Sequence, residues 1–250
     1  MTPPRWVGLA NYQELFSDPT FYQILRNTLV FSFIYVSGVM VVGLFLAVLV
    51  NSKLKGINFF RTSFFTPVVT SAVAVGLVWS WILAPKYGIL NNFLQRVLHL
   101  NPPVWLEDTG WALIVIALIQ VWKMAGYYMI IYLAGLQDIP GTLYEAAEID
   151  GATGWQRFVR ITLPLLTPTT FFVFTIAIID SFRNFAIIYT MTRGGPENAT
   201  NTIVYSVFLN AFQFYRMGYA GALAYVLLII VGIITLVNFL LKKYWVQYQY

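Results

Sequence analysis

Long apolar runs without charged residues dominate the sequence. Four of them lie at 27–52, 62–85, 109–137 and 217–241, and only Lys123 interrupts the third. A fifth run, 161–192, contains Asp180 and Arg183. Because the hydrocarbon core of a bilayer is about 30 Å thick and takes roughly 20 helical residues to cross, each run is long enough to span it. We therefore predict five membrane-spanning helices, at 28–50, 64–83, 111–137, 165–191 and 219–241.

The composition supports membrane residence. Of the 250 residues, 59% are hydrophobic and only 10% are charged, against about 25% charged in an ordinary soluble domain. The formal charge of +5 is spread over loops without a dense basic run, so nucleic-acid binding is not expected. The chain has no cysteine for disulfides or thiolate metal ligands, and we interpret its single histidine, His99, as an ordinary loop residue. The predicted fold class is an all-α integral membrane protein, a polytopic helical bundle.

The charges in the connecting segments predict the orientation of the chain. The first connection, 51–63, carries Lys53, Lys55 and Arg61 and no acid, which marks it as cytoplasmic. Alternation then places 84–110 and 192–218 outside, and 138–164 and the tail 242–250 inside. The transmembrane domain is therefore 28–241. The tail contains four aromatic residues that predict an interfacial anchor: Tyr244, Trp245, Tyr248 and Tyr250.

Residues 1–27 form a segment ahead of the first predicted span. Leu9, Tyr12, Leu15 and Phe16 fall at helical spacing, and Asp18-Pro19 follows them. We expect this segment to lie flat at the outer interface. Nothing in it resembles a cleavable signal peptide.

The segment 138–164 is too polar to span the membrane and has strong local signals. Thr142 and Glu145 have the spacing of a capping box, which predicts a helix start there. Gly151 predicts its end, because glycine accepts the left-handed conformation of a C-terminal cap. Thr153 and Gln156 repeat the box. The sequence therefore predicts a helix, a glycine break and a second helix.

The residues of the two short helices also predict a docking role for the first helix and the position at which the second helix ends. The first carries Glu145, Glu148 and Asp150 among small alanines, a pattern suited to docking into a groove of another protein. Pro164 is expected to end the second helix before the next span.

These residues resemble the coupling loop of bacterial ABC importer permeases. The matching residues are Glu145-Ala146-Ala147, Asp150-Gly151-Ala152, Phe158, Ile161, Leu163-Pro164 and Pro168. Similarity to the carbohydrate branch, the maltose-type and glycerol-phosphate-type first permease, is carried by Leu143-Tyr144, Thr192, Gly194-Gly195-Pro196, Thr200 and Gly218-Tyr219-Ala220.

The resemblance implies a type I importer permease in a bacterial cytoplasmic (inner) membrane. Its expected partners are a second permease, two cytoplasmic ATPases that bind ATP and Mg²⁺, an external solute-binding protein, a sugar substrate and membrane lipid. The chain has no G-x-x-x-x-G-K-[ST] stretch, so we expect it to be a transport subunit with no cofactor of its own rather than an enzyme. The resemblance implies that six residues couple to the ATPases, namely Glu145, Ala146, Ala147, Asp150, Gly151 and Ala152. It implies that Gly194, Gly195 and Pro196 contact the binding protein. It also implies a further membrane helix ahead of this sequence.

Polar residues inside the spans are the candidate substrate pathway. Inserting an ionisable side chain into a membrane span costs about 2.5 to 3.5 kcal/mol of free energy. Asp180 and Arg183 are three residues apart, so they could share a helix face as an ion pair, or contact substrate together with Asn184 and Tyr189. Aromatic rings such as Phe182 or Phe185 would then stack on sugar faces.

Lys123, with Gln120 one turn before it, is the second candidate in the membrane. Its side chain either snorkels along the bundle or contacts substrate.

Other functions remain open at this point. The same class of permease could carry glycerol phosphate or a polyamine. An ion-coupled secondary transporter could use Asp180 and Arg183, but it leaves the segment 138–164 unexplained. A membrane-embedded enzyme has no support, because no histidine cluster, nucleophile elbow or metal-ligand spacing occurs in any span.

Overall fold

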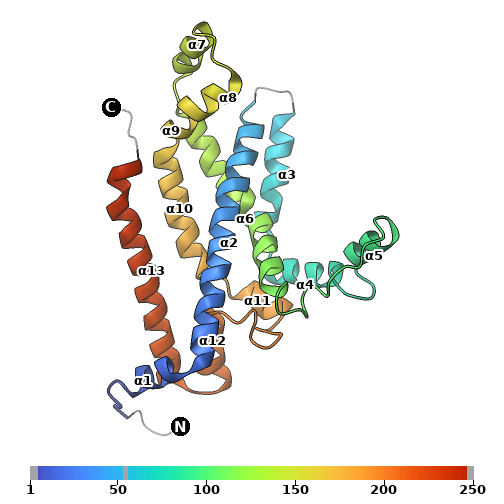
Figure 1. Ribbon diagram of the computed structural model, residues 1–250, viewed down its shortest axis with the longest axis vertical. Coiled ribbons are helices and arrows are strands. Elements are labelled where there is room, and N and C mark those ends of the chain that lie inside the picture. The colour runs from blue at the N-terminus through green and yellow to red at the C-terminus, as the bar shows by residue number, and fades with distance from the viewer. Residues whose placement is uncertain (1–4, 53–55, 247–250) are drawn as a thin grey trace. The chain divides into compact units, whose positions relative to one another are not determined.

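The computed structural model describes residues 5–52 and 56–246, and every regular element in these two ranges is helical (Figure 1). Three helices are long and apolar enough to cross a membrane: α2 (Pro19–Val50), α6 (Ala112–Gln137) and α13 (Met217–Trp245). Two bent helix pairs raise the number of candidate spans to five. With each bent pair counted as one span, this number equals the five spans predicted from the sequence. Lys53, Lys55, Tyr248 and Tyr250 lie outside the described residues.

The predicted second span is two helices rather than one. They are α3 (Ile57–Val69) and α4 (Ala72–Ile82), separated at Thr70 and Ser71. Pro67 lies in the last turn of α3, where its ring and missing N–H weaken helix continuation. The prediction of a continuous helix at 64–83 is therefore wrong.

The predicted fourth span is also broken. α10 (Thr167–Ser181) ends before the turn at 182–185, and α11 (Ala186–Met191) follows. Upstream, α8 (Gly154–Arg157) continues through the π-helix η1 (Phe158–Thr162) into α9 (Leu163–Leu165). Pro164 therefore does not end the helix as predicted, because the wider π turn ahead of it accommodates its missing N–H. The bend, of 63°, comes at Leu166 instead.

Further helices lie in the connections. α1 (Ala10–Ser17) confirms the helical spacing ahead of the first span, which itself begins at Pro19 rather than at 28. α7 (Gly141–Ile149) and α8 form the predicted pair in 138–164. The outer connections contain helices that the sequence did not predict: α5 (Ile89–Arg96), α12 (Ile203–Phe208) and the π-helix η2 (Leu209–Gln213).

The chain forms two compact units. The first comprises Met1–Phe33, Ser71–Ala117 and Ser181–Ile233, and the second Ile34–Thr70, Leu118–Asp180 and Ile234–Tyr250. In the first unit, a buried hydrophobic cluster joins α1, the start of α2, α12 and the start of α13. Its residues are Leu15, Phe21, Ile24, Ile203, Tyr219 and Leu223. α4 packs on α11, with Gly76 against Thr190.

Helices of the second unit approach each other closely at glycines. A Cβ at Gly126 on α6 would lie 2.1 Å from the carbonyl oxygen of Phe64 on α3. An added Cβ at Gly43 on α2 would also clash with Tyr128, and one at Gly135 on α6 would clash with Thr169 on α10. Small residues at helix contacts are typical of membrane bundles, where van der Waals packing replaces the hydrophobic effect.

Candidate functional site

Helix α7 opens the predicted coupling loop. Pro140 is its N-cap residue, with φ −59° and ψ 129°, and no side chain caps the first turn. The predicted capping box of Thr142 and Glu145 is therefore wrong. Because Pro140 supplies the extended conformation that precedes a helix, α7 begins at Gly141, and Thr142 lies inside the first turn.

The end of α7 confirms the role predicted for Gly151. This residue has φ +74°, and its amide donates to the Glu148 carbonyl at 3.0 Å. The amide of Ala152 donates to the Ala147 carbonyl at 2.9 Å. Together these two bonds form a Schellman motif, which satisfies carbonyls at the helix end and turns the chain toward α8.

The second predicted capping box is confirmed at the start of α8. The Gln156 amide donates to the Thr153 hydroxyl at 3.3 Å, and the Thr153 amide donates to the Gln156 side-chain oxygen at 2.8 Å. The break between the two short helices is therefore fixed by local bonds on both sides.

Two longer-range contacts tie α7 to the helix that follows, and the sequence did not predict them. The hydroxyls of Tyr144 on α7 and Thr162 on η1 share a hydrogen bond of 2.9 Å. The guanidinium of Arg157 pairs with the Glu148 carboxylate at 3.1 Å. Since the Glu148 side chain is 74% exposed, the ion pair contributes less than about 1 kcal/mol. The half-buried Tyr144 bond is the firmer brace, at about 0.5–1.5 kcal/mol.

The coupling loop presents an open surface. α7 has no buried residue, and Ile149 is 88% exposed. The six residues predicted to couple to the ATPases all lie on α7 or its C-terminal turn; Glu145, Ala146, Asp150 and Gly151 are exposed, and Ala147 and Ala152 are half-buried. In Figure 1, α7 and α8 extend beyond the end of α10.

Lys123 on α6 is buried, with 6% of its surface exposed. Its ammonium donates to the carbonyl oxygens of Pro67 at 3.3 Å and Val68 at 3.1 Å. These carbonyls belong to the last turn of α3, where the helix ends and no i+4 amide continues the ladder; the Pro67 carbonyl also accepts from the Thr70 amide and hydroxyl. The lysine therefore caps a broken span and does not snorkel to the surface.

Asp180 lies in the last turn of α10, and its carboxylate accepts a hydrogen bond of 3.1 Å from the Tyr35 hydroxyl on α2. It also interacts electrostatically with Lys123. Because α10 ends at Ser181, Arg183 lies in the turn beyond the helix and is exposed. The prediction that Asp180 and Arg183 share one helix face is therefore wrong.

The remaining pathway candidates lie in different surroundings. Gln120 is buried, and its side-chain oxygen has no hydrogen-bond partner among the described residues. The amide of Asn184 donates to the Ser181 carbonyl at 3.3 Å. The ring of Tyr189 stacks on that of Phe185, with 5.4 Å between the ring centroids. Phe182, the other ring proposed for sugar stacking, is buried, with 5% of its surface exposed. Substrate contact by these residues stays a prediction.

The connection 192–202, which the sequence predicts to lie outside and which is called the outer loop below, is held by a dense set of hydrogen bonds. The Thr192 hydroxyl bonds to that of Thr200 at 2.7 Å, and Thr200 donates to the Gly195 carbonyl at 2.7 Å. Asn27 on α2 donates to the carbonyls of Asn198 at 2.7 Å and Asn201 at 3.0 Å. The loop is therefore anchored to the start of α2.

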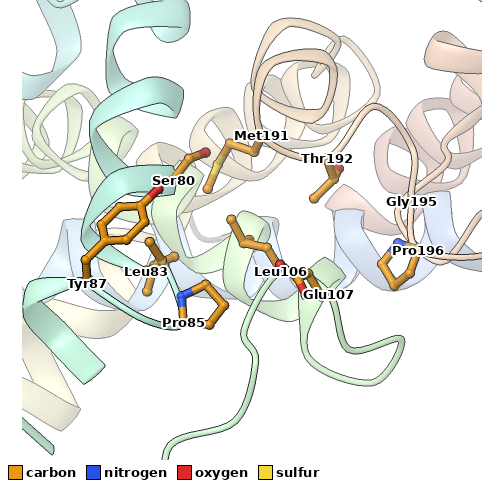
Figure 2. A pocket seen from close by; sticks show the side chains of 11 residues that line it. Ser80, Leu83, Pro85, Tyr87, Leu106, Glu107, Met191, Thr192, Gly195 and Pro196 are labelled. Atoms are coloured by element: carbon orange, nitrogen blue, oxygen red, sulfur yellow. The ribbon is translucent and has the colours of Figure 1, made fainter. Parts of the chain in front are cut away.

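Two of the three residues predicted to contact a binding protein line a cavity. Gly195 and Pro196, joined by a cis peptide bond, form one wall of a space of about 430 Å³ (Figure 2). Gly194 is buried behind them with φ +83°, and a Cβ there would lie 2.7 Å from the ring of Tyr205. Only glycine fits this position without strain.

The family of the chain follows from its match to a family model. The family described as the binding-protein-dependent transport system inner membrane component matches residues 39–245. The chain belongs to this family. The match includes the coupling loop and the outer loop, and it confirms the predicted permease class and inner-membrane location.

Individual relatives of this permease agree with the family. It is 38% identical over 252 residues to the probable ABC transporter permease protein YesP of Bacillus subtilis, covering 99% of this chain and 81% of YesP. It is 36% identical over 235 residues to the arabinooligosaccharides transport system permease protein AraP of the same organism, covering 93% of this chain and 75% of AraP. A solved bacterial alginate ABC transporter, in complex with an alginate pentasaccharide-bound periplasmic protein, matches the permease with a TM-score of 0.86 and 26% identity, over 95% of this chain and 83% of that chain. The predicted helical importer fold is confirmed.

Proposed function

We propose that this permease carries a sugar, an oligosaccharide or a sugar-like polyol into the cell by alternating access, with energy from ATP hydrolysed by partner subunits. The coupling loop is the observation that carries the proposal. Its first helix has no buried residue and ends in the Schellman motif at Gly151, which supports a role in docking to another protein. The carbohydrate class is supported by the names of AraP and of the alginate transporter.

In this proposal, α7 transmits the movement of the ATPases to the membrane helices. The ATPases bind ATP and Mg²⁺, close around α7 and displace it. Tyr144 passes the displacement to Thr162, and the helix through Pro164 passes it to α10. A second permease completes the pathway, and an external binding protein delivers the solute. Asp180, Asn184 and Tyr189 are proposed to line the pathway.

The coupling role is tested by two glycine substitutions at the ends of α7. An added Cβ meets no atom within 4 Å at either Gly141 or Gly151, but only Gly151 has a positive φ. Gly151→Ala therefore strains the loop by about 1–2 kcal/mol, whereas Gly141→Ala is the matched control. We expect Gly151→Ala, and separately Glu145→Lys, to reduce co-purification of the ATPases and solute-driven ATP hydrolysis. Unchanged association and transport in both variants would refute the coupling role.

The substrate class is tested on the external binding protein that works with this permease. Sugars, polyols, glycerol phosphate, polyamines, amino acids and inorganic ions are screened for a rise in its melting temperature, since a ligand stabilises the state it binds. We expect the largest rise with a sugar or polyol. If only amino acids or inorganic ions raised it, the carbohydrate assignment would fail.

A further inference from the structure

The cavity in Figure 2 is bounded by three stretches of chain that all belong to the first compact unit. One stretch is the end of α4 and the turn after it, with Ser80 and Tyr87; another contributes Leu106 and Glu107; the third runs from Met191 to Pro196. Tyr87 is 66% exposed, so the cavity opens to the surroundings at its ring. No lysine or arginine lines it.

Glu107 is held in place by the residues on either side of it. The Trp105 indole donates to the Asn91 side-chain oxygen on α5 at 2.6 Å. The Asp108 carboxylate accepts bonds from the amides of Gly110 at 2.7 Å and Trp111 at 3.1 Å. Within residues 5–52 and 56–246, the Glu107 carboxylate itself has no ion pair. A negative charge is therefore fixed at the cavity wall without a cation to neutralise it.

The aliphatic hydroxyls on the wall, those of Ser80 and Thr192, already use their protons within the chain. The Ser80 hydroxyl donates to the Gly76 carbonyl at 2.8 Å. The Thr192 hydroxyl lies within hydrogen-bond distance of the Ile188 carbonyl and of the Thr200 hydroxyl, so its single proton is used inside the chain. What the wall still offers is acceptor oxygens, the charge of Glu107, and the exposed ring and hydroxyl of Tyr87. An arginine or lysine suits such a wall, because it has only donors, carries the opposite charge and is attracted to an aromatic face.

The basic residues adjacent to the cavity do not fill this role. Lys86 and Arg193 follow lining residues in the sequence but do not themselves line the cavity. The Arg193 charge acts on the Tyr205 hydroxyl instead. A cation that pairs with Glu107 inside the cavity therefore has to be supplied by another molecule.

We propose that this cavity receives an arginine or lysine side chain of the external solute-binding protein, with Glu107 as its counter-ion. The inference rests on the proposed function, because it assumes that a binding protein docks on this side of the permease. Continuity with the rigid outer loop supports this occupant, since Gly195 and Pro196 form part of the same wall. The permease thereby selects its binding protein by the negative charge of Glu107 in this cavity.

The test uses the complete transporter in lipid nanodiscs and the solute-binding protein that stimulates its ATP hydrolysis. The substitution is Glu107→Gln, which keeps the shape of an exposed side chain. Glu197→Gln is the matched control, because Glu197 is also an exposed outer acid but does not line the cavity. We expect Glu107→Gln to weaken binding about tenfold and to reduce its salt dependence, with Glu197→Gln changing it less than twofold.

A double-mutant cycle then identifies the occupant. Each exposed arginine or lysine of the binding protein is replaced with alanine, and we expect one of them to lose its effect in the Glu107→Gln transporter. The inference is overturned if Glu107→Gln binds normally, if Glu197→Gln weakens binding equally, or if Glu107→Gln disturbs only assembly of the two permeases. If the unmodified transporter neither binds nor responds to any solute-binding protein, the proposed function fails as well, and that outcome is visible before any substitution is made.

Discussion

Replacing Gly126 with alanine should destabilise the bundle, although alanine is the better helix former. An added Cβ would lie 2.1 Å from the Phe64 carbonyl oxygen, 2.8 Å from its carbon and 2.9 Å from the Phe65 Cα. Ordinary contact begins at 3.4 Å, so α6 and α3 would have to separate by 3.4 − 2.1 = 1.3 Å. All three atoms are backbone, and no rotamer change relieves the clash.

The magnitude follows from two opposing effects. Overpacking costs about 1–3 kcal/mol, and a backbone clash belongs at the upper end of that range. The gain in helix propensity from glycine to alanine is about 1 kcal/mol. We therefore expect a net loss of about 2 kcal/mol in the free energy of unfolding, which lowers the melting temperature by about 4–8 °C for a chain of this size.

Gly221→Ala is the matched control. Gly221 is also inside a long apolar helix, α13, and an added Cβ there meets nothing within 4 Å. Only the propensity effect remains, so this variant should melt at or slightly above the temperature of the unmodified protein. The assay is the fraction of monodisperse transporter that survives heating in detergent. If Gly126→Ala melts as high as Gly221→Ala, the close contact between α6 and α3 is refuted.

Three other contacts described above can be tested by substitution. Lys123→Met removes the side-chain donor to the Val68 carbonyl of α3, and the same heating assay should show a loss of about 1–3 kcal/mol; the control Gln120→Met, which removes a side-chain oxygen without a partner among the described residues, should cost less. Tyr144→Phe should leave the fold intact but lower the number of solute molecules transported per ATP hydrolysed, because the brace to Thr162 is lost. Asn27→Ala frees the outer loop, and hydrogen exchange at 198–201 should become at least tenfold faster, since a loop opening that is easier by about 1.4 kcal/mol is ten times more frequent.

Each of these has a result that contradicts it. Equal melting of Lys123→Met and the unmodified protein would show that the lysine does not stabilise the end of α3. A Tyr144→Phe transporter with unchanged coupling would place force transmission elsewhere. Unaltered exchange in Asn27→Ala would mean that the other bonds of the loop suffice.

The sequence predicted the unbroken spans well and the broken ones poorly. α6 and α13 coincide with their predicted ranges to within a few residues. The apolar runs at 64–83 and 165–191 are also long enough to span a bilayer, yet each contains a break. Hydrophobicity measures whether a segment is stable in lipid and does not report whether its backbone is continuous. The Val68 carbonyl at one break is satisfied by Lys123, a residue 55 positions away.

Local chemistry explains which parts of the coupling loop were predictable. Gly151 and the pair Thr153 and Gln156 act through bonds that span five residues or fewer, and both predictions hold. The box at Thr142 failed because Pro140 already starts the helix. The Tyr144 brace joins residues 18 apart, and no spacing rule connects them before the chain is folded.

The outer loop is anchored through main-chain oxygens, and this has a consequence for how the transporter could come to recognise a different binding protein during evolution. Gln23 and Asn27 hold this loop by the main-chain oxygens of Glu197, Asn198 and Asn201. Every residue type supplies that oxygen, so the anchor does not depend on the side chain at the position of the accepting carbonyl. The external face can thus accumulate substitutions that suit a new delivery protein while its backbone keeps one shape, which makes recognition evolvable separately from transport.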